Sequence, residues 1–139
     1  MNSLVNYRLA KLLKEKGFDE PCRYVYDTWN NIKDWLEDGE GEHRNSHKNR
    51  SVYYSAPTIA KVVMWLYERH KIWISVPPPY YEEGKYLFCW LVQVLNDPTV
   101  EQNCWVSFTE TDNINGFETP EKAYESGVEY VLLNLFKTI

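Results

Sequence analysis

The sequence has few glycines, and they fall in no pattern that phosphate binding requires. Six glycines are scattered along the 139 residues, and neither GxGxxG nor GxxxxGK[ST] can be written anywhere in the chain. Such loops bring backbone N–H groups together around a phosphate group. Nucleotide-dependent chemistry is therefore not expected.

Cysteine is also scarce. Cys22, Cys89 and Cys104 are odd in number and lack the CxxC spacing that disulfide exchange and zinc clusters use. Cys89 and Cys104 stand in apolar, strand-like segments, where a thiol usually packs as an inert side chain. We expect reduced thiols in a cytoplasmic protein.

Long apolar runs are absent. No segment approaches the roughly 18 consecutive apolar residues of a membrane span. Arg8 and Lys11 interrupt the first residues, so no signal peptide is expected. The net charge of -5 repels phosphate backbones and anionic lipids. We therefore expect no membrane partner and no general affinity for nucleic acid.

Aromatic residues, in contrast, are abundant. Six Trp, eleven Tyr and five Phe make up 16% of the chain, and a small core has limited room for so many large rings. Several rings are therefore predicted to reach the surface. The length and the 44% hydrophobic content are typical of one globular domain, so residues 1–139 are predicted to form a single domain.

Three segments have the apolar spacing of amphipathic helices. The first covers residues 3–16 and ends at Gly17, a suitable C-terminal cap residue. The second begins near Pro57 and carries a wide apolar stripe as far as Tyr67. The third begins at Thr119-Pro120, where a capping side chain precedes a proline in the first turn.

Four segments are rich in β-branched and aromatic residues and are predicted to be strands: 21–27, 72–76, 85–95 and 104–109. Prolines 77–79 and the turn-forming Asn96-Asp97-Pro98 separate the last three, which suggests a meander. The order α-β-α-β-β-β-α predicts an α+β fold, with three helices packed on a mainly antiparallel sheet of about four strands.

The region between the first strand and the second helix is harder to interpret. Trp29, Ile32, Trp35 and Leu36 are predicted to form a short helical turn that packs two tryptophans on the core. Residues 37–51, acidic and then basic around two glycines, are predicted to form a mobile loop.

No candidate metal or catalytic site in the sequence has all the residues that such a site requires. His43 and His47 are four residues apart but lack a third ligand, which favours a solvated loop. Residues 111–122 resemble a calcium loop, yet Lys122 stands where the bidentate glutamate belongs. His70 is suited to complement a helix C-terminus. We predict no catalytic residue, no metal and no cofactor, and a non-enzymatic protein is favoured.

Two groups of tyrosines are predicted to bind a partner. Residues 76–86 combine three prolines with Tyr80, Tyr81 and Tyr86, which predicts a stiff loop that presents amphipathic rings. Alternatively, the prolines only end a strand and the tyrosines lie over the core edge. Tyr53 and Tyr54 form the second group. Together with the nearby Arg44, Lys48 and Arg50, they could grip a single nucleic-acid strand, although upstream acidic residues offset that attraction.

Three segments resemble a group of small, uncharacterised phage and prophage proteins of gut bacteria of the Bacteroides type. They are LAKLLKEKGFDEPC (9–22), SAPTIAKVVMWLYERHKIWISV (55–76) and TPEKAYESGVEYVLLNL (119–135), which together cover the three predicted helices. The resemblance implies a cytoplasmic protein of phage origin. It supplies no catalytic motif.

Three functions follow as hypotheses. The first is a non-enzymatic phage accessory protein that binds an unidentified host or phage protein through exposed aromatic residues. The second is a small enzyme or ligand-binding protein, with Glu, Tyr and His in a cleft between sheet and helices and a carboxylate of shifted pKa. The third is single-strand binding through residues 44–54, which would weaken steeply as salt rises.

Overall fold

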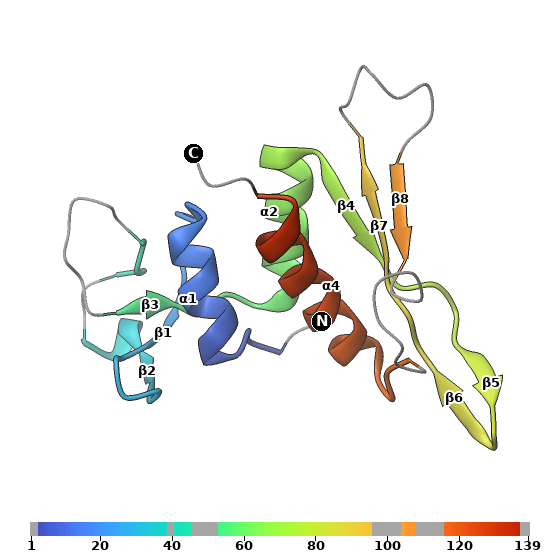
Figure 1. Ribbon diagram of the computed structural model, residues 1–139. Coiled ribbons are helices and arrows are strands. Elements are labelled where there is room, and N and C mark those ends of the chain that lie inside the picture. Colours follow the sequence, from blue (N-terminus) through green and yellow to red (C-terminus); the bar gives the residue numbers. More distant parts are fainter. Residues whose placement is uncertain (1–2, 39–40, 46–52, 96–103, 108–115, 137–139) are drawn as a thin grey trace. The chain divides into compact units, whose positions relative to one another are not determined.

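The computed structural model describes residues 3–38, 41–45, 53–95, 104–107 and 116–136 (Figure 1). Its helices and its antiparallel strands, which lie in small sheets, confirm the predicted α+β class. Contacts within the chain group residues 2–58 into one compact unit, the N-terminal unit, and residues 59–139 into another, the C-terminal unit. The single domain stays a prediction.

Helix α1 (Tyr7–Glu15) begins later than the predicted Ser3 because Asn6 caps it. The Asn6 side chain accepts a hydrogen bond from the Leu9 backbone N–H at 2.8 Å, as an N-cap residue does. At the other end Gly17 has a φ of +89°, and the Phe18 N–H bonds to the Leu13 carbonyl at 2.9 Å. The predicted glycine cap is thereby confirmed.

The N-terminal unit contains one small antiparallel sheet in the order β2–β1–β3. The central strand β1 (Tyr24–Tyr26) confirms the strand predicted at 21–27, and it pairs with β2 (Ile32–Asp34) and β3 (Tyr54–Ser55). Val25, at the centre of β1, is fully buried. This sheet and α1 form the core of the unit.

The prediction of a helical turn that packs both Trp29 and Trp35 on the core is wrong for Trp29, whereas the Trp35 ring packs against the buried His43 with the ring centroids 5.0 Å apart. Ile32 lies in β2, and only the short 3-10 helix η1 (Trp35–Asp38) follows it. Trp29 lies in the turn between β1 and β2 and is 82% exposed. The Asp27 carboxylate accepts hydrogen bonds from the backbone of Trp29 and Asn31, and these bonds close a turn in place of a helix.

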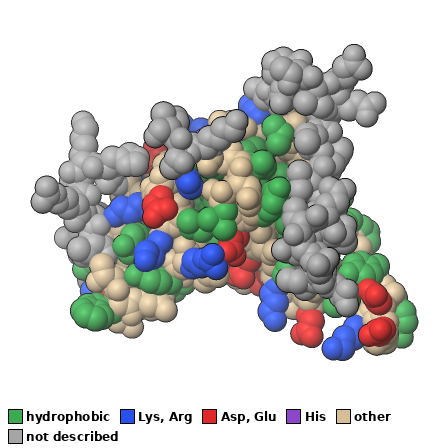
Figure 2. Space-filling view, in the orientation of Figure 1, with side chains coloured by type: hydrophobic (Ala, Val, Ile, Leu, Met, Phe, Trp, Pro, Cys, Tyr) green, Lys and Arg blue, Asp and Glu red, His purple; other side chains and the backbone are tan. Residues whose placement is uncertain are grey.

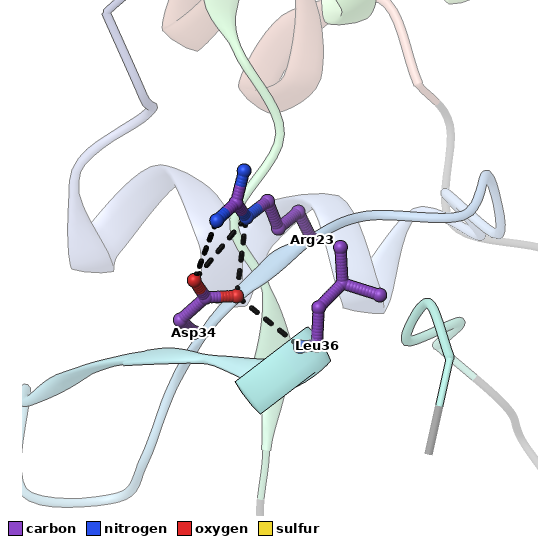
Figure 3. A network of polar contacts seen from close by, with 3 residues as sticks. All are labelled: Arg23, Asp34 and Leu36. Carbon is purple, nitrogen blue, oxygen red and sulfur yellow. Dashed lines mark hydrogen bonds and ion pairs between the residues drawn. The ribbon is translucent and has the colours of Figure 1, made fainter. Parts of the chain in front are cut away.

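An ion pair joins the residue before β1 to the end of β2 (Figure 3). The Arg23 guanidinium donates to the Asp34 carboxylate through Nε and Nη2, at 3.2 and 2.8 Å. Asp34 also accepts the Leu36 backbone N–H at 3.2 Å, so it orients the start of η1. These hydrogen bonds, led by the one from Arg23, lower the pKa of Asp34.

The C-terminal unit starts with α2 (Ile59–His70), which runs almost directly into β4 (Ile72–Ser75) through Lys71, a residue with a φ of +55°. Strands β4, β7 (Leu91–Val94) and β8 (Cys104–Ser107) pair antiparallel in that order. The predicted meander is confirmed for these three strands.

The single strand predicted for residues 85–95 is wrong, because it is two strands with different partners. Its first part, β6 (Lys85–Leu87), pairs with β5 (Tyr80–Glu82), whereas β7 pairs with β4 and β8. Glu83 and Gly84 connect β5 to β6 with φ values of +50° and +82°. Two central residues with positive φ define the tight type I′ turn of β-hairpins.

Helix α4 (Pro120–Asn134) covers the β4–β7–β8 sheet of this unit and also contacts α2 (Figure 1). The Thr119 hydroxyl accepts the Lys122 N–H at 3.2 Å, which confirms the predicted cap. Trp90 is completely buried beneath α4, and its indole N–H donates to Ser126 at 3.1 Å. Trp90 belongs to the core of this unit. Its buried side chains include Ile59, Val62, Leu66, Ile74, Trp90, Val92, Val128, Val131 and Leu132.

Candidate functional site

The β5–β6 hairpin presents two tyrosines that are mostly exposed. Tyr81 and Tyr86 lie directly opposite each other on the two strands and are 66% and 65% exposed. Their ring centroids are 5.3 Å apart at an interplanar angle of 65°, the edge-to-face arrangement that aromatic pairs prefer. Each ring therefore limits the motion of the other while both stay accessible.

Charged side chains lie at the turn end of the same hairpin, but those of Glu82 and Lys85 point to the face opposite the two rings, because successive side chains of a strand alternate between faces. Glu82 and Lys85 are cross-strand partners, and Glu83 lies in the turn; all three are exposed. Figure 2 shows hydrophobic, acidic and basic side chains together at its lower right, where the hairpin lies. We call Tyr81, Tyr86 and these three charged residues the hairpin surface.

Tyr80 is placed differently from the other two predicted tyrosines of this segment. It is partly buried, and a β-carbon at Gly116 would lie only 2.6 Å from its hydroxyl oxygen. Burial, followed by the nearby Glu82 and Cys89, raises the pKa of the Tyr80 phenol. The alternative reading of the sequence, a tyrosine over the core edge, thus describes Tyr80. The ring pair of Tyr81 and Tyr86 fits the predicted exposed surface.

The second predicted tyrosine group belongs to the N-terminal unit and lies in two separate contacts. The ring of Tyr53 packs edge-on against Trp35 at 5.1 Å, and the Lys33 ammonium lies 5.6 Å from its centroid. The ring of Tyr54 packs against Tyr7 at 5.8 Å. These tyrosines are partly buried and contribute to the packing of their unit.

This packing bears on the hypothesis of single-strand binding. The Lys14 ammonium lies 5.1 Å from the centroid of the Tyr54 ring, so a stacked base would have to displace it. The Arg44 guanidinium donates to the Asp19 carbonyl at 3.5 Å. Lys48 and Arg50, the other cations of that hypothesis, lie outside the described residues. Nothing in the described geometry adds support for nucleic-acid binding.

A buried polar cluster lies around His43. Its backbone pairs with Cys22 through two hydrogen bonds of 2.8 Å, and its Nδ1 lies 2.7 Å from the Ser55 hydroxyl oxygen. The Asn45 side chain accepts the Ser55 N–H at 3.0 Å and donates to the Phe18 carbonyl at 2.9 Å. His43 is only 6% exposed, so the predicted solvated loop is wrong for this histidine.

Burial is the main cause that lowers the pKa of His43, and the positive charge of Lys14 acts in the same direction. A serine beside a histidine base is also how a nucleophilic site begins. Ser55, however, has no exposed surface, so a substrate carbonyl has no approach to its oxygen. We assign the cluster a structural role: it joins residues 41–45 to β3 and to the chain around Phe18 and Cys22.

Among the described residues, no group of three or more His, Cys, Asp and Glu side chains is arranged to hold a metal ion. In the same residues, no helix has the length and apolar character needed to cross a membrane. Partial burial raises the pKa of Glu125 on α4, with Glu121 acting in the same direction and Lys122 against it. A carboxylate of shifted pKa is one requirement of the enzyme hypothesis, which stays a prediction.

Comparison with known proteins yields no relative: no family model, no curated protein and no solved structure matches the chain.

Proposed function

We propose that this protein is non-enzymatic and acts by binding another protein through the hairpin surface. The observation that carries the proposal is the contact between Tyr81 and Tyr86, two large rings that stay mostly exposed while they touch each other. The resemblance to phage proteins supports an origin in a phage or prophage, and hence a host or phage protein as the partner in the bacterial cytoplasm.

Tyrosine is well suited to such a contact. Its ring supplies a large apolar area, its hydroxyl supplies a hydrogen bond, and two side-chain torsions leave little conformational entropy to lose on binding. The type I′ turn and the mutual ring contact further restrict Tyr81 and Tyr86 before any partner arrives. Preorganisation of this kind improves affinity because less order has to be imposed during association.

The charge of the chain narrows the class of partner. Residues 2–58 contain nine Lys and Arg and nine Asp and Glu, whereas residues 59–139 contain six and eleven. The whole net charge of -5 therefore lies in the C-terminal unit, which carries the hairpin. A partner with an excess of Lys and Arg around an apolar contact would be attracted, and an anionic polymer would be repelled.

The test compares partner capture by the full-length wild-type chain and by the double variant Tyr81→Ala/Tyr86→Ala, using extracts of phage-infected or prophage-carrying cells. We expect the double variant to capture at least about tenfold less of the partner protein than the wild type, because a pair of buried aromatic anchors contributes several kcal/mol to an interface. Tyr81→Phe/Tyr86→Phe should keep most of the binding because both rings remain.

Met64→Ala is the matched control, because Met64 is a 44% exposed apolar residue of the same unit outside the hairpin surface. Circular dichroism should show that all variants fold like the wild type. Undiminished capture by the double alanine variant, or equal losses with Met64→Ala, would contradict the proposal.

A further inference from the structure

Trp29, in the N-terminal unit, is a large apolar side chain that lies mostly in solvent. It is 82% exposed, more than Tyr81 and Tyr86 of the hairpin surface. Tryptophan on average is a highly buried residue, and leaving it in water forgoes about 2–3 kcal/mol of burial free energy. The exposed indole of Trp29 offers a large apolar area to a partner.

The turn that carries Trp29 is rigidly built. The Asp27 carboxylate accepts the N–H groups of Trp29 and Asn31 at 2.8 and 3.0 Å, and the Asp27 N–H donates to the Asn31 carbonyl at 3.0 Å. Asn30 adopts a φ of +63°, which asparagine tolerates better than most residues. We call residues 27–31 the Trp29 turn.

A contact from α1 also fixes the turn. The Tyr7 hydroxyl donates to the Thr28 carbonyl at 3.3 Å, and the Tyr7 ring packs against Tyr26 in the adjoining strand at 5.7 Å. The backbone on both sides of Trp29 is thus held by hydrogen bonds. The indole projects from a fixed support, which is how a preformed binding anchor is built.

The residues next to Trp29 in the sequence are polar and exposed. None of residues 28–32 (TWNNI) carries a charge, and the charged Asp27 and Lys33 border this segment on either side. The one nearby carboxylate, Asp27, is occupied by the turn itself; the hydrogen bond from Asn31 is the first cause that lowers its pKa. An aromatic anchor surrounded by Thr and Asn is the side-chain chemistry that antibody-like binding loops use against proteins.

From this arrangement we propose that the Trp29 turn is a second interaction surface, independent of the hairpin surface, which inserts its indole into an apolar pocket of a protein partner with an uncharged, hydrogen-bonding rim. Such a contact differs in kind from the charged hairpin surface. It predicts an affinity that depends on the indole and changes little with salt.

Two other classes of partner fit the observations less well. A nucleic acid needs concentrated positive charge, and the N-terminal unit has equal numbers of basic and acidic residues. An interfacial membrane contact needs a broad apolar face supported by Lys and Arg, whereas the residues next to Trp29 are Thr28 and Asn30. Both remain as outcomes of the experiment that follows.

The experiment places a photoreactive benzophenone amino acid at position 28 of the full-length chain, an exposed position next to the intact Trp29, and irradiates it in an extract of the cells that produce the protein. We expect one adduct of discrete mass, with an unchanged yield between about 0.05 M and about 0.5 M salt. Unlabelled wild-type chain should compete for it. The Trp29→Ala variant should compete equally only at a concentration about thirty-fold higher than that of the wild type, which is the loss expected for a hot-spot tryptophan. The Trp29→Phe variant should compete at a lower concentration than Trp29→Ala.

Leu36→Ala is the matched control, because Leu36 is an apolar residue of the same unit that is 42% exposed; it should compete like the wild type. Asp27→Ala, which keeps the indole but loosens the turn, should compete less well than the wild type. Absence of an adduct, or equal competition by Trp29→Ala, would overturn the proposal. So would co-sedimentation of the wild type, but not of Trp29→Ala, with phosphatidylglycerol vesicles or a single-stranded oligonucleotide.

Discussion

At the scale of single residues, His43 and Trp29 both lie where their local sequence does not predict. The partner of His43, Ser55, is twelve positions away and beyond residues 46–52, so no spacing pattern reveals it. The spacing of Trp29, Ile32, Trp35 and Leu36 predicts a helical turn that faces the core, but Asp27 closes a different turn, in which Trp29 is exposed. Long-range pairing and turn chemistry overrode local spacing at these two positions.

The buried His43 makes stability depend on pH. Its pKa in the folded chain lies below the unfolded value of about 6.5, so the unfolded chain takes up the proton first as pH falls. The free energy of unfolding should therefore be constant above about pH 6.5 as far as His43 is concerned, and should decline below it until the folded-state pKa is passed. Urea unfolding between about pH 5 and pH 8 measures the slope.

His43→Asn, which keeps a polar group near Ser55 but does not titrate, should flatten that slope. His70→Asn serves as the comparison: burial and Arg69 also lower the pKa of His70, yet its side chain is exposed. A nuclear magnetic resonance titration in which His43 protonates at or above pH 6.5 would refute the expected direction.

Among the glycines that the structure describes, Gly116 has the least space around it. It has a φ of +103°, and an added β-carbon would lie 2.6 Å from the Tyr80 hydroxyl and 3.0 Å from the Leu87 β-carbon. Gly116→Ala should lower the free energy of unfolding by about 2–4 kcal/mol, from backbone strain and crowding together. Gly17→Ala separates the two effects, because Gly17 has a φ of +89° but nothing within 4 Å. Equal losses in urea unfolding would show that crowding contributes nothing.

At the scale of elements, helices whose ends carry local signals were predicted best. Thr119 and Pro120 begin α4, and the apolar stripe of α2 is buried over Ile59, Val62, Val63 and Leu66. The prediction for residues 85–95 was wrong because a continuous apolar segment does not show that the paired strand changes between Leu87 and Leu91. The Glu83-Gly84 turn that creates the hairpin surface was the missing signal.

The approach of α4 to its sheet depends on Gly127. Alanine is normally better than glycine in a helix by about 1 kcal/mol. At this position, however, the new β-carbon would lie 3.1 Å from Ile74 and 3.2 Å from Trp90. The Trp90 indole donates a hydrogen bond to Ser126, and its ring packs on Tyr130, so it has little freedom to move away. Overpacking costs about 1–3 kcal/mol, and we expect Gly127→Ala to destabilise the protein by about 1–2 kcal/mol net.

Thermal unfolding measures this change. In an Ile74→Ala background part of the crowding disappears, so Gly127→Ala should cost less there, a coupling that a double-mutant cycle detects. If Gly127→Ala instead stabilised the protein, the sheet would have moved to accommodate the new β-carbon, and the higher helix propensity of alanine would determine the change in stability.

At the scale of the whole molecule, the order of helices and strands predicted an α+β protein and the composition predicted rings at the surface, but neither could predict two compact units. Each unit has its own buried side chains, among them Leu13 in the first and Leu132 in the second. The average hydrophobicity of a chain does not show which buried residues pack in the same core. The division depends on contacts between residues far apart in the sequence, and these leave no mark on composition.

The two units can be tested by hydrogen exchange. Leu13→Ala and Leu132→Ala each remove a fully buried leucine and should each cost about 2–5 kcal/mol. If the units open separately, Leu13→Ala should accelerate exchange within residues 2–58 and leave 59–139 protected, and Leu132→Ala should do the reverse. Acceleration of the whole chain by either substitution would show one cooperative domain, as the sequence predicts.

The contrast between Trp29 and Trp90 also has an optical consequence. An indole in water emits fluorescence at longer wavelength than one sealed in a core and is reached by dissolved quenchers, so Trp29 should dominate the red edge of the emission and Trp90 should be shielded. Trp29 is thus an intrinsic fluorescent reporter of partner binding. Any partner that encloses the indole of Trp29 should shift its emission to the blue and shield it from iodide, without a label of any kind.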